Sequence, residues 1–211
     1  MKIIVIGAGA MGCLYGAYLS RHNDVTMLDV YEPQVESINQ NGITVLEEDG
    51  TEQHFSGVRA MKSGTCSEVA DLVIVFVKST HTESSLEENK ELFGENTLVM
   101  TLQNGAGNDR KIAKYVKTEN IIIGTSKHNS VNLGGGKIRH SGNGVTTIGS
   151  NLEENTHLQT VADLLTEAGF QSAVSDDIQR IIWSKLFVNL SINTFTAITE
   201  TPIAYMIENQ Y

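Results

Sequence analysis

The chain has 211 residues, of which 40% are hydrophobic, 19% charged and 6% aromatic, and its 15 Lys and Arg against 25 Asp and Glu give a formal charge of −10. This composition excludes a wholly disordered chain and disfavours nucleic acid and anionic membranes as partners. It leaves room for small anionic ligands. Two cysteines cannot build a disulfide framework, so we expect a cytoplasmic protein of one domain or one and a fraction.

Residues 3–20 carry no charge, so a signal peptide or a membrane helix is one interpretation of this segment. Glycines at positions 7, 9, 12 and 16 weaken a helix there, and no small-residue cleavage site follows. Elsewhere the longest apolar run, Leu72–Val77, is too short to span a bilayer. We therefore expect a strand, a glycine turn and a helix, and no membrane partner.

Short apolar runs alternate with helical patterns along the chain. Strands are predicted at Lys2–Ile6, Val25–Leu28, Ile43–Leu46, Glu52–Phe55, Leu72–Val77, Thr97–Leu102, Asn120–Gly124 and Gln171–Val174. Helices are predicted at Ala10–Ser20, Pro33–Gln40, Thr82–Phe93, Asn108–Val116 and Thr156–Ala168. An Asp-Gly turn makes the third and fourth strands a hairpin, and Ser126–Ser150 contains short alternating strands.

This order predicts an α/β fold with a Rossmann-type, mostly parallel sheet and added antiparallel strands. From Asp176 onward the strand signal ends, and Asp176–Ala197 and a segment opened by Pro202 are predicted helices. We therefore place a dinucleotide-binding domain at 1–175 and the start of an all-helical substrate and dimerisation domain at 176–211. The second domain is expected to be incomplete, and a homodimer is one expected assembly.

The turn Gly7-Ala8-Gly9-Ala10-Met11-Gly12 fits G-x-G-x-x-G between a strand and a helix. In this pattern the first glycine allows the tight turn and the second lets backbone approach a pyrophosphate. The third lets the helix pack against the strand, and the helix N-terminus faces the phosphates. Asp29 ends the second strand, where a carboxylate accepts hydrogen bonds from the adenosine ribose and repels a 2′-phosphate. The residues predict a bound dinucleotide, with NAD favoured over NADP.

The long C-terminal helix carries a polar stripe. At about 100° per residue, Lys185, Asn189, Asn193 and Thr196 share one side of an otherwise apolar segment. An apolar helix of this kind is expected to be buried, and a buried lysine requires a hydrogen-bond or ion-pair partner, or a functional role. We predict a ligand site in which Lys185 donates a proton to a developing oxyanion and the amides orient substrate. The alternative is a plain exposed face.

Two further candidates follow directly after predicted strands, at the edge where open α/β sheets bind ligands. They are Lys78 and the run Gln103-Asn104-Gly105. Either one fits an ordinary turn as well.

Taken together, these motifs resemble the ketopantoate reductase (2-dehydropantoate 2-reductase) family from Met1 to about Pro202. The resemblance rests on the glycine turn, Val77-Lys78, Leu102-Gln103-Asn104-Gly105, the Gly136–Gly144 stretch with Ile148-Gly149, and Trp183-Ser184-Lys185-Leu186 with Asn189 and Asn193. It implies hydride transfer from a nicotinamide to 2-dehydropantoate, giving pantoate for pantothenate and coenzyme A synthesis.

In this family the lysine matching Lys185 is the general acid, and the asparagines matching Asn189 and Asn193 contact substrate. Asn104 matches a residue beside the nicotinamide and the reacting carbonyl, and Lys78 matches a lysine that contacts the cofactor. With Gln103 and Asp29, these residues and the glycine turn complete the predicted site for NADPH or NADH and a small anionic 2-keto acid.

The sequence departs from the family in two respects. The family usually prefers NADPH, with a basic residue where Asp29 stands, so the choice of cofactor and of 2-keto acid stays open. Family members also run to roughly 300 residues, and their helical domain supplies a serine and an acidic residue to the substrate site. The chain is therefore expected to be truncated or naturally shortened.

Two other functions compete with this one: an NAD-dependent 2-hydroxyacid dehydrogenase on the same fold, and a non-catalytic NAD(P)-binding regulator. The regulator would have no need for the Lys185 stripe. The six histidines and two cysteines show no metal-ligand spacing, so no metal site is expected. His140 is expected to be structural.

Overall fold

The computed structural model describes residues 1–202, 204 and 205. Its strands are β1 (Lys2–Ile6), β2 (Asp24–Asp29), β3 (Ile43–Leu46), β4 (Glu52–Phe55), β5 (Val58–Lys62), β6 (Leu72–Val75), β7 (Leu98–Thr101), β8 (Ile121–Ser126), β9 (Asn129–Gly134), β10 (Lys137–Gly142), β11 (Thr146–Gly149) and β12 (Ser172–Val174). Its α-helices are α1 (Ala10–Leu19), α2 (Glu32–Asn41), α3 (Thr82–Glu88), α4 (Asn108–Ile112), α5 (His157–Ala168) and α6 (Ile178–Thr199).

The main sheet has eight strands in the order β12-β11-β8-β7-β6-β1-β2-β5. The six strands from β8 to β5 pair in parallel, whereas β11 pairs antiparallel with β8. The strand order reverses beside β1, so β1 with its glycine turn lies at a switch point, where such sheets bind ligands. The predicted Rossmann-type fold with added antiparallel strands is confirmed.

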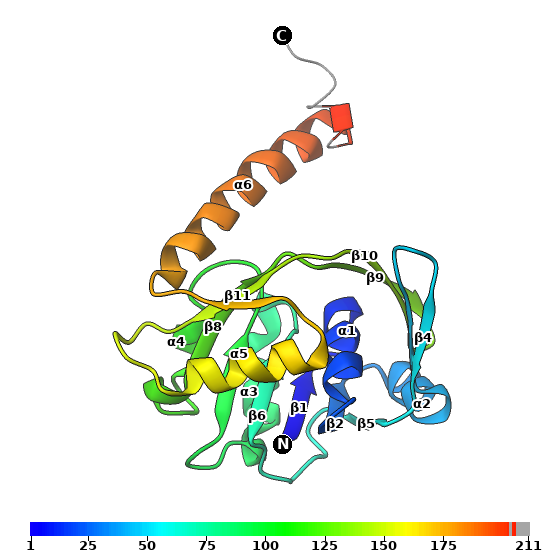
Figure 1. Ribbon diagram of the computed structural model, residues 1–211, viewed down its shortest axis with the longest axis vertical. Helices are drawn as coiled ribbons and strands as arrows, with labels where there is room; N and C mark the ends of the chain where they lie inside the picture. Colours follow the sequence, from blue (N-terminus) through cyan, green and yellow to red (C-terminus); the bar gives the residue numbers. More distant parts are fainter. Residues whose placement is uncertain (203, 206–211) are drawn as a thin grey trace.

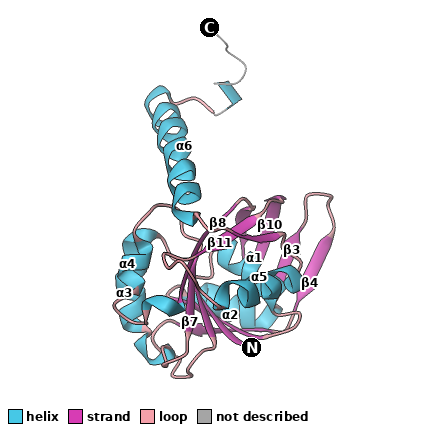
Figure 2. Cartoon of the chain, turned by 60° about the vertical axis from the view of Figure 1, so that its left-hand side comes forward, coloured by secondary structure: helices cyan, strands magenta, loops and turns pink. Residues whose placement is uncertain are grey.

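Helices cover both faces of the main sheet, which explains why its central strands are apolar on both sides. One core cluster joins the sheet to α1, α2 and α5, and the other joins it to α3, α4 and the first turn of α6. Figures 1 and 2 show α3 and α4 on the opposite side of the sheet from α1 and α5.

Four strands form a second, separate sheet in the order β4-β3-β10-β9. The prediction was wrong in adding all strands of Ser126–Ser150 to the main sheet, because only β11 joins it. β10 instead pairs in parallel with β3, more than ninety residues earlier in the chain. Strand β5 was also missed, since Arg59 and Lys62 interrupt its apolar residues Val58, Ala60 and Met61, which form no continuous run.

The long helix α6 leaves the body of the molecule (Figure 1), and of its residues only Ile178 and Ile182 are buried. The expectation of a helix buried nearly all round is therefore wrong. Its first turns pack on β8 and β11, and no described residue of the helix after Ile182 is buried. The helix predicted after Pro202 lies largely among residues outside the described ones, and the boundary near 175 stays a prediction.

Candidate active site

The glycine turn has the geometry that its pattern requires. Gly7 adopts φ +104°, and a Cβ there would lie 2.9 Å from the amide N of Val77. A Cβ on Gly12 would lie 1.9 Å from the carbonyl O of Gly7, so only glycine lets α1 pack this closely on the turn. A Cβ on Gly9 would meet nothing within 4 Å. The backbone at Gly9 is therefore open to a ligand, directly before the N-terminus of α1 at Ala10, as a pyrophosphate site requires.

The carboxylate of Asp29 is held by backbone amides on both oxygens. Its Oδ2 accepts from the amide of Ala8 at 2.6 Å, and its Oδ1 accepts from the amide of Tyr31 at 2.9 Å. Asp29 thus ties the end of β2 to the glycine turn. Each oxygen keeps acceptor capacity for a further hydrogen bond, such as one from a ribose hydroxyl.

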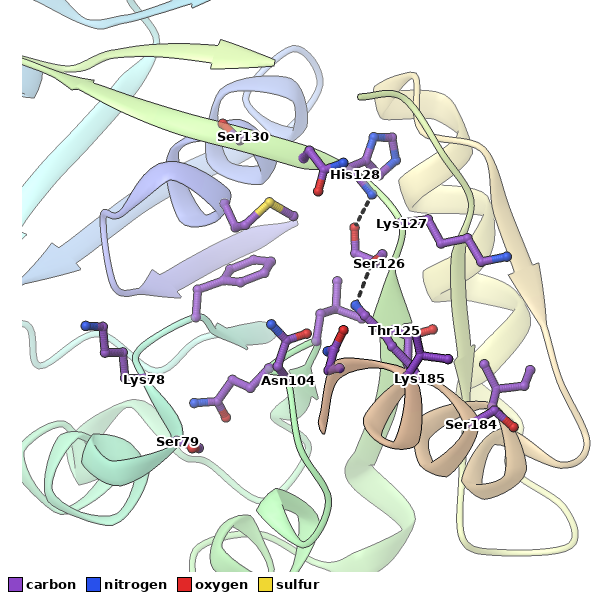
Figure 3. A pocket seen from close by; sticks show the side chains of 18 of the residues that line it. Lys78, Ser79, Asn104, Thr125, Ser126, Lys127, His128, Ser130, Ser184 and Lys185 are labelled. Atoms are coloured by element: carbon purple, nitrogen blue, oxygen red, sulfur yellow. Dashed lines mark hydrogen bonds between the residues drawn. The ribbon is translucent and has the colours of Figure 1, made fainter. Parts of the chain in front are cut away.

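A cavity of about 1110 Å³ opens at the carboxyl ends of β6, β7 and β8, where the side chain of Met11 reaches it from α1 and the first turns of α6 close one side (Figure 3). Among the predicted site residues it is lined by Met11, Lys78, Gln103, Asn104, Lys185 and Asn189. Asn193 lies one turn further along α6, outside the described lining. The strand-end residues and the helix stripe, predicted separately, thus meet at one cavity.

Lys185 is partly buried against β8, and its Nζ donates a hydrogen bond to the carbonyl O of Ser126 at 2.7 Å. Desolvation by burial lowers the pKa of its ammonium group, and the nearby charge of Lys127 lowers it further. A lysine with a lowered pKa gives up its proton more readily near neutral pH, which suits a general acid. The buried Ile178 and Ile182 anchor this part of α6, so the position of Lys185 is fixed.

Gln103 organises the loop after β7, whereas Asn104 and Lys78 remain exposed at the cavity. The side-chain Nε2 of Gln103 donates to the carbonyl O of Val77 and to Thr82 Oγ1, and its side-chain Oε1 accepts from Thr101 Oγ1. Gln103 therefore joins the carboxyl ends of β6 and β7. In the described residues the side chains of Asn104 and Lys78 make no hydrogen bond, which leaves them available to ligands.

Sequence reasoning missed the stretch after β8, which lines the cavity with Ser126, Lys127 and Ser130, and it also missed Arg180 on α6. Ser130 Oγ is buried without a hydrogen-bond partner. The rule that selected Lys78, that ligands bind at the carboxyl ends of strands, applies equally to Lys127, which directly follows β8.

A buried polar chain lies behind that stretch. Glu47 accepts from Tyr18, Gln53 and His140, and His140 shares a hydrogen bond of 3.0 Å with His128 Nδ1. Both histidines are almost fully buried. Burial and the charge of His140 lower the pKa of His128 to about 4. This network connects the second sheet to the cavity-lining stretch and supports the structural role expected for His140.

Comparison with known proteins decides the family. Residues 3–153 match the family described as ketopantoate reductase PanE/ApbA. The chain belongs to the ketopantoate reductase family. Among curated relatives, 2-dehydropantoate 2-reductase of Halobacterium salinarum is 31% identical over 99% of this chain and 69% of its own length. The predicted resemblance is confirmed, and with it a nicotinamide-dependent oxidoreductase family that acts on a keto acid.

Solved structures of the family have the same fold. 2-Dehydropantoate 2-reductase from Geobacter metallireducens superposes with a TM-score of 0.91 at 30% identity, over 100% of this chain and 69% of that one. A ternary structure of D-mandelate dehydrogenase with NADH and anilino(oxo)acetate superposes with a TM-score of 0.89 at 29% identity, over 95% and 65%. This chain thus spans about two thirds of the length of its relatives.

By length and composition alone, α6 could cross a membrane, with a mean hydropathy of 1.2 and little burial. The core helix of a soluble protein passes the same test. In this chain α6 carries Lys185 and Asn189 to the cavity, which gives it a role at the site.

Proposed function

We propose that this chain reduces 2-dehydropantoate to pantoate with a reduced nicotinamide cofactor. The observation that carries the proposal is the partly buried Lys185, which faces one cavity together with Asn104, beside the glycine turn. A non-catalytic nucleotide-binding module would not need a desolvated lysine there.

The cavity suits both ligands of this reaction. The open backbone at Gly9 and the N-terminus of α1 fit the pyrophosphate of a dinucleotide, and Lys78 lines the cavity together with Met11 of the glycine turn. When bound, the dihydronicotinamide supplies a hydride to the keto carbon. The side chain of Asn104 is free to orient the carbonyl, and Asn189 to orient the polar groups of the substrate.

The proton comes from Lys185. As the keto carbon gains the hydride, the C=O π electrons move onto oxygen, and Lys185 Nζ protonates this oxygen. The lysine is left as a neutral amine, which is reprotonated from solvent. Lys185 must therefore be charged at the start, so kcat/KM falls as pH rises through its pKa, which lies below that of an ordinary lysine.

For the cofactor, we infer a preference for NADH. Asp29, with Glu32 three residues later, places two carboxylates where a 2′-phosphate would have to lie. Glu32 also forms an ion pair with Lys62, so this lysine is not free to bind a phosphate. A related D-mandelate dehydrogenase binds NADH. That neighbour supports a second candidate, in which this chain reduces another 2-keto acid with the same residues.

The deciding experiment is a steady-state assay of this chain that crosses NADH and NADPH with 2-dehydropantoate, benzoylformate and pyruvate. Turnover of 2-dehydropantoate with the highest kcat/KM supports the proposal, whereas a preference for benzoylformate would select the second candidate. Lys185→Ala is expected to lower kcat by about 10²–10⁴-fold, with cofactor affinity retained. Unchanged kcat in this variant would reject Lys185 as the acid.

We further propose a cytoplasmic location and a homodimer. The net charge of −10 and the two free cysteines support the first, and the apolar face of α6 supports the second.

A further inference from the structure

The charges around the cavity differ from those of the whole chain. Four cationic side chains line it, those of Lys78, Lys127, Arg180 and Lys185, and its described lining contains no Asp or Glu. The protein as a whole has ten more acidic than basic residues. A cavity whose charge is opposite to that of the molecule concentrates anions locally.

In the described residues these cations have no acidic partners. Most lysines elsewhere do form ion pairs, such as Lys62 with Glu32 and Lys114 with Glu83. Within the described part of the chain, neither Lys127 nor Arg180 has a side-chain hydrogen bond or ion pair. The ammonium of Lys127 is therefore available to a ligand.

Lys127 and Lys185 share one side of the cavity. Figure 3 shows both on the far side of Asn104 from Lys78, with the side chain of Lys127 extended away from Asn104, so it has to turn to reach a ligand in the cavity. They are also joined through the backbone, because Ser126, whose carbonyl holds Lys185 Nζ, directly precedes Lys127. A ligand that reaches Lys185 therefore also lies within the field of Lys127.

The backbone of Lys127 is fixed by its neighbours. Its amide donates to the carbonyl O of Val145 at 3.1 Å. A Cβ on Gly144 would lie 2.6 Å from the Cβ of Lys127, so glycine at 144 is what allows this close approach. Only the end of the exposed Lys127 side chain is free to move toward a ligand.

We propose that Lys127 determines substrate specificity by binding the carboxylate of the 2-keto acid while Lys185 acts on the adjacent carbonyl. This inference rests on the proposed function and deepens it. A 2-keto acid carries its carboxylate directly beside the keto carbon, so two neighbouring cations match its two oxygen-bearing groups. Lys127 then favours 2-keto acids over neutral carbonyl compounds.

Binding of a substrate carboxylate also changes the electrostatic repulsion between Lys127 and Lys185. Lys127 repels the ammonium of Lys185, and among the described residues no carboxylate lines the cavity to offset this repulsion. The other titratable groups at the cavity are Lys78, Arg180 and His128, and burial keeps His128 neutral. A bound carboxylate neutralises Lys127, so Lys185 holds its proton more firmly once substrate is present.

The first test compares Lys127→Met with Lys127→Arg in the assay. Lys127→Met is expected to raise KM for the 2-keto acid by about tenfold or more, because the hydrogen bond to the charged carboxylate is lost. The methyl ester of the same acid lacks the charge, and its KM should not change. Lys127→Arg should restore the preference for the acid. Lys137→Met removes a distant lysine of β10 and is the matched control.

The second test needs no turnover. Reductive methylation with ¹³C-formaldehyde gives each lysine an NMR signal, and Lys185→Arg assigns that of Lys185. Lys127→Met should raise the pKa of Lys185, and Lys127→Arg should leave it low. In parallel, calorimetry should show weaker binding of oxamate, a mimic of a 2-keto acid, to Lys127→Met in the presence of NADH.

The two tests separate the possible failures. A wild-type chain that turns over no 2-keto acid would reject the proposed function, while the oxamate titration would still test Lys127. Equal oxamate affinity in wild type and Lys127→Met, or an acid-to-ester preference that survives in this variant, would overturn the role of Lys127.

Discussion

At the scale of single residues, cofactor choice depends on the charges at the end of β2. Asp29 is fixed by two backbone amides and cannot turn away from a ligand. Lys62 lies opposite Asp29 in the register of β2 and β5, yet its ammonium is paired with Glu32. Lys62 is therefore a basic residue near the end of β2 that the ion pair with Glu32 keeps from binding a phosphate.

Replacing Glu32 should release that lysine. The Glu32–Lys62 pair is exposed and contributes little to stability, so Glu32→Gln should fold normally. We expect the wild type to bind NADH more tightly than NADPH, and Glu32→Gln to bind NADPH about tenfold more tightly, a change of about 1.4 kcal/mol. Calorimetric titration with each cofactor measures both affinities.

Glu36→Gln is the control, because it removes the same charge from α2 one turn further along. Tighter binding of NADPH than NADH by the wild type would refute the preference. An equal gain in both glutamate variants would show a general charge effect instead of the release of Lys62.

At the scale of elements, the buried histidine pair links the second sheet to the stretch that lines the cavity. His128 lies among Tyr15, Phe170 and His140, and its Nε2 is buried without a hydrogen-bond partner in the described residues. The nearest carboxylate, Glu47, is bonded to His140, Tyr18 and Gln53. Protonation of His128 should therefore destabilise the fold.

The sign follows from the pKa of His128, which folding lowers from 6.5 to about 4. The unfolded chain binds the proton more readily, so stability is complete above about pH 6.5 and is lost as pH falls toward 4. The loss should be on the order of 1–3 kcal/mol. Urea unfolding at pH 7 and pH 4.5 measures it, in wild type and in His128→Phe, which should lose much less over this range.

His22→Gln serves as the comparison, because His22 is exposed and its replacement should leave the pH dependence intact. If His128→Phe keeps the wild-type dependence, the acid sensitivity arises elsewhere in the molecule.

The elements that could be predicted were those with local signals. Apolar runs located the central strands, and G-x-G-x-x-G located the turn after β1. The pairing of β3 with β10 and the approach of Lys127 to Lys185 join residues far apart in the chain, and no local pattern encodes them. Asn193 was predicted on the same stripe of the helix as Lys185, but it lies one turn beyond the described cavity lining, because periodicity gives the direction of a side chain and not the extent of a site.

At the scale of the whole molecule, α6 presents apolar side chains to solvent over most of its length. Phe187, Leu190 and Ile198 are 62%, 55% and 77% exposed. Contiguous exposed apolar surface of this kind marks an interaction face. Because burial of apolar area drives association, we expect this chain to self-associate through α6 at micromolar concentration.

The substitutions Leu190→Lys and Ile198→Lys together should abolish that association, since they place charges on the face while leaving Ile178 and Ile182 buried. Sedimentation velocity across a concentration series distinguishes the species, and Lys62→Glu with Glu32→Lys, a charge swap far from α6, is the control. A wild-type chain that stays monomeric at every concentration would contradict the expectation. Partition of the wild type, but not of the double variant, into phosphatidylcholine vesicles would instead assign the face of α6 to a lipid surface.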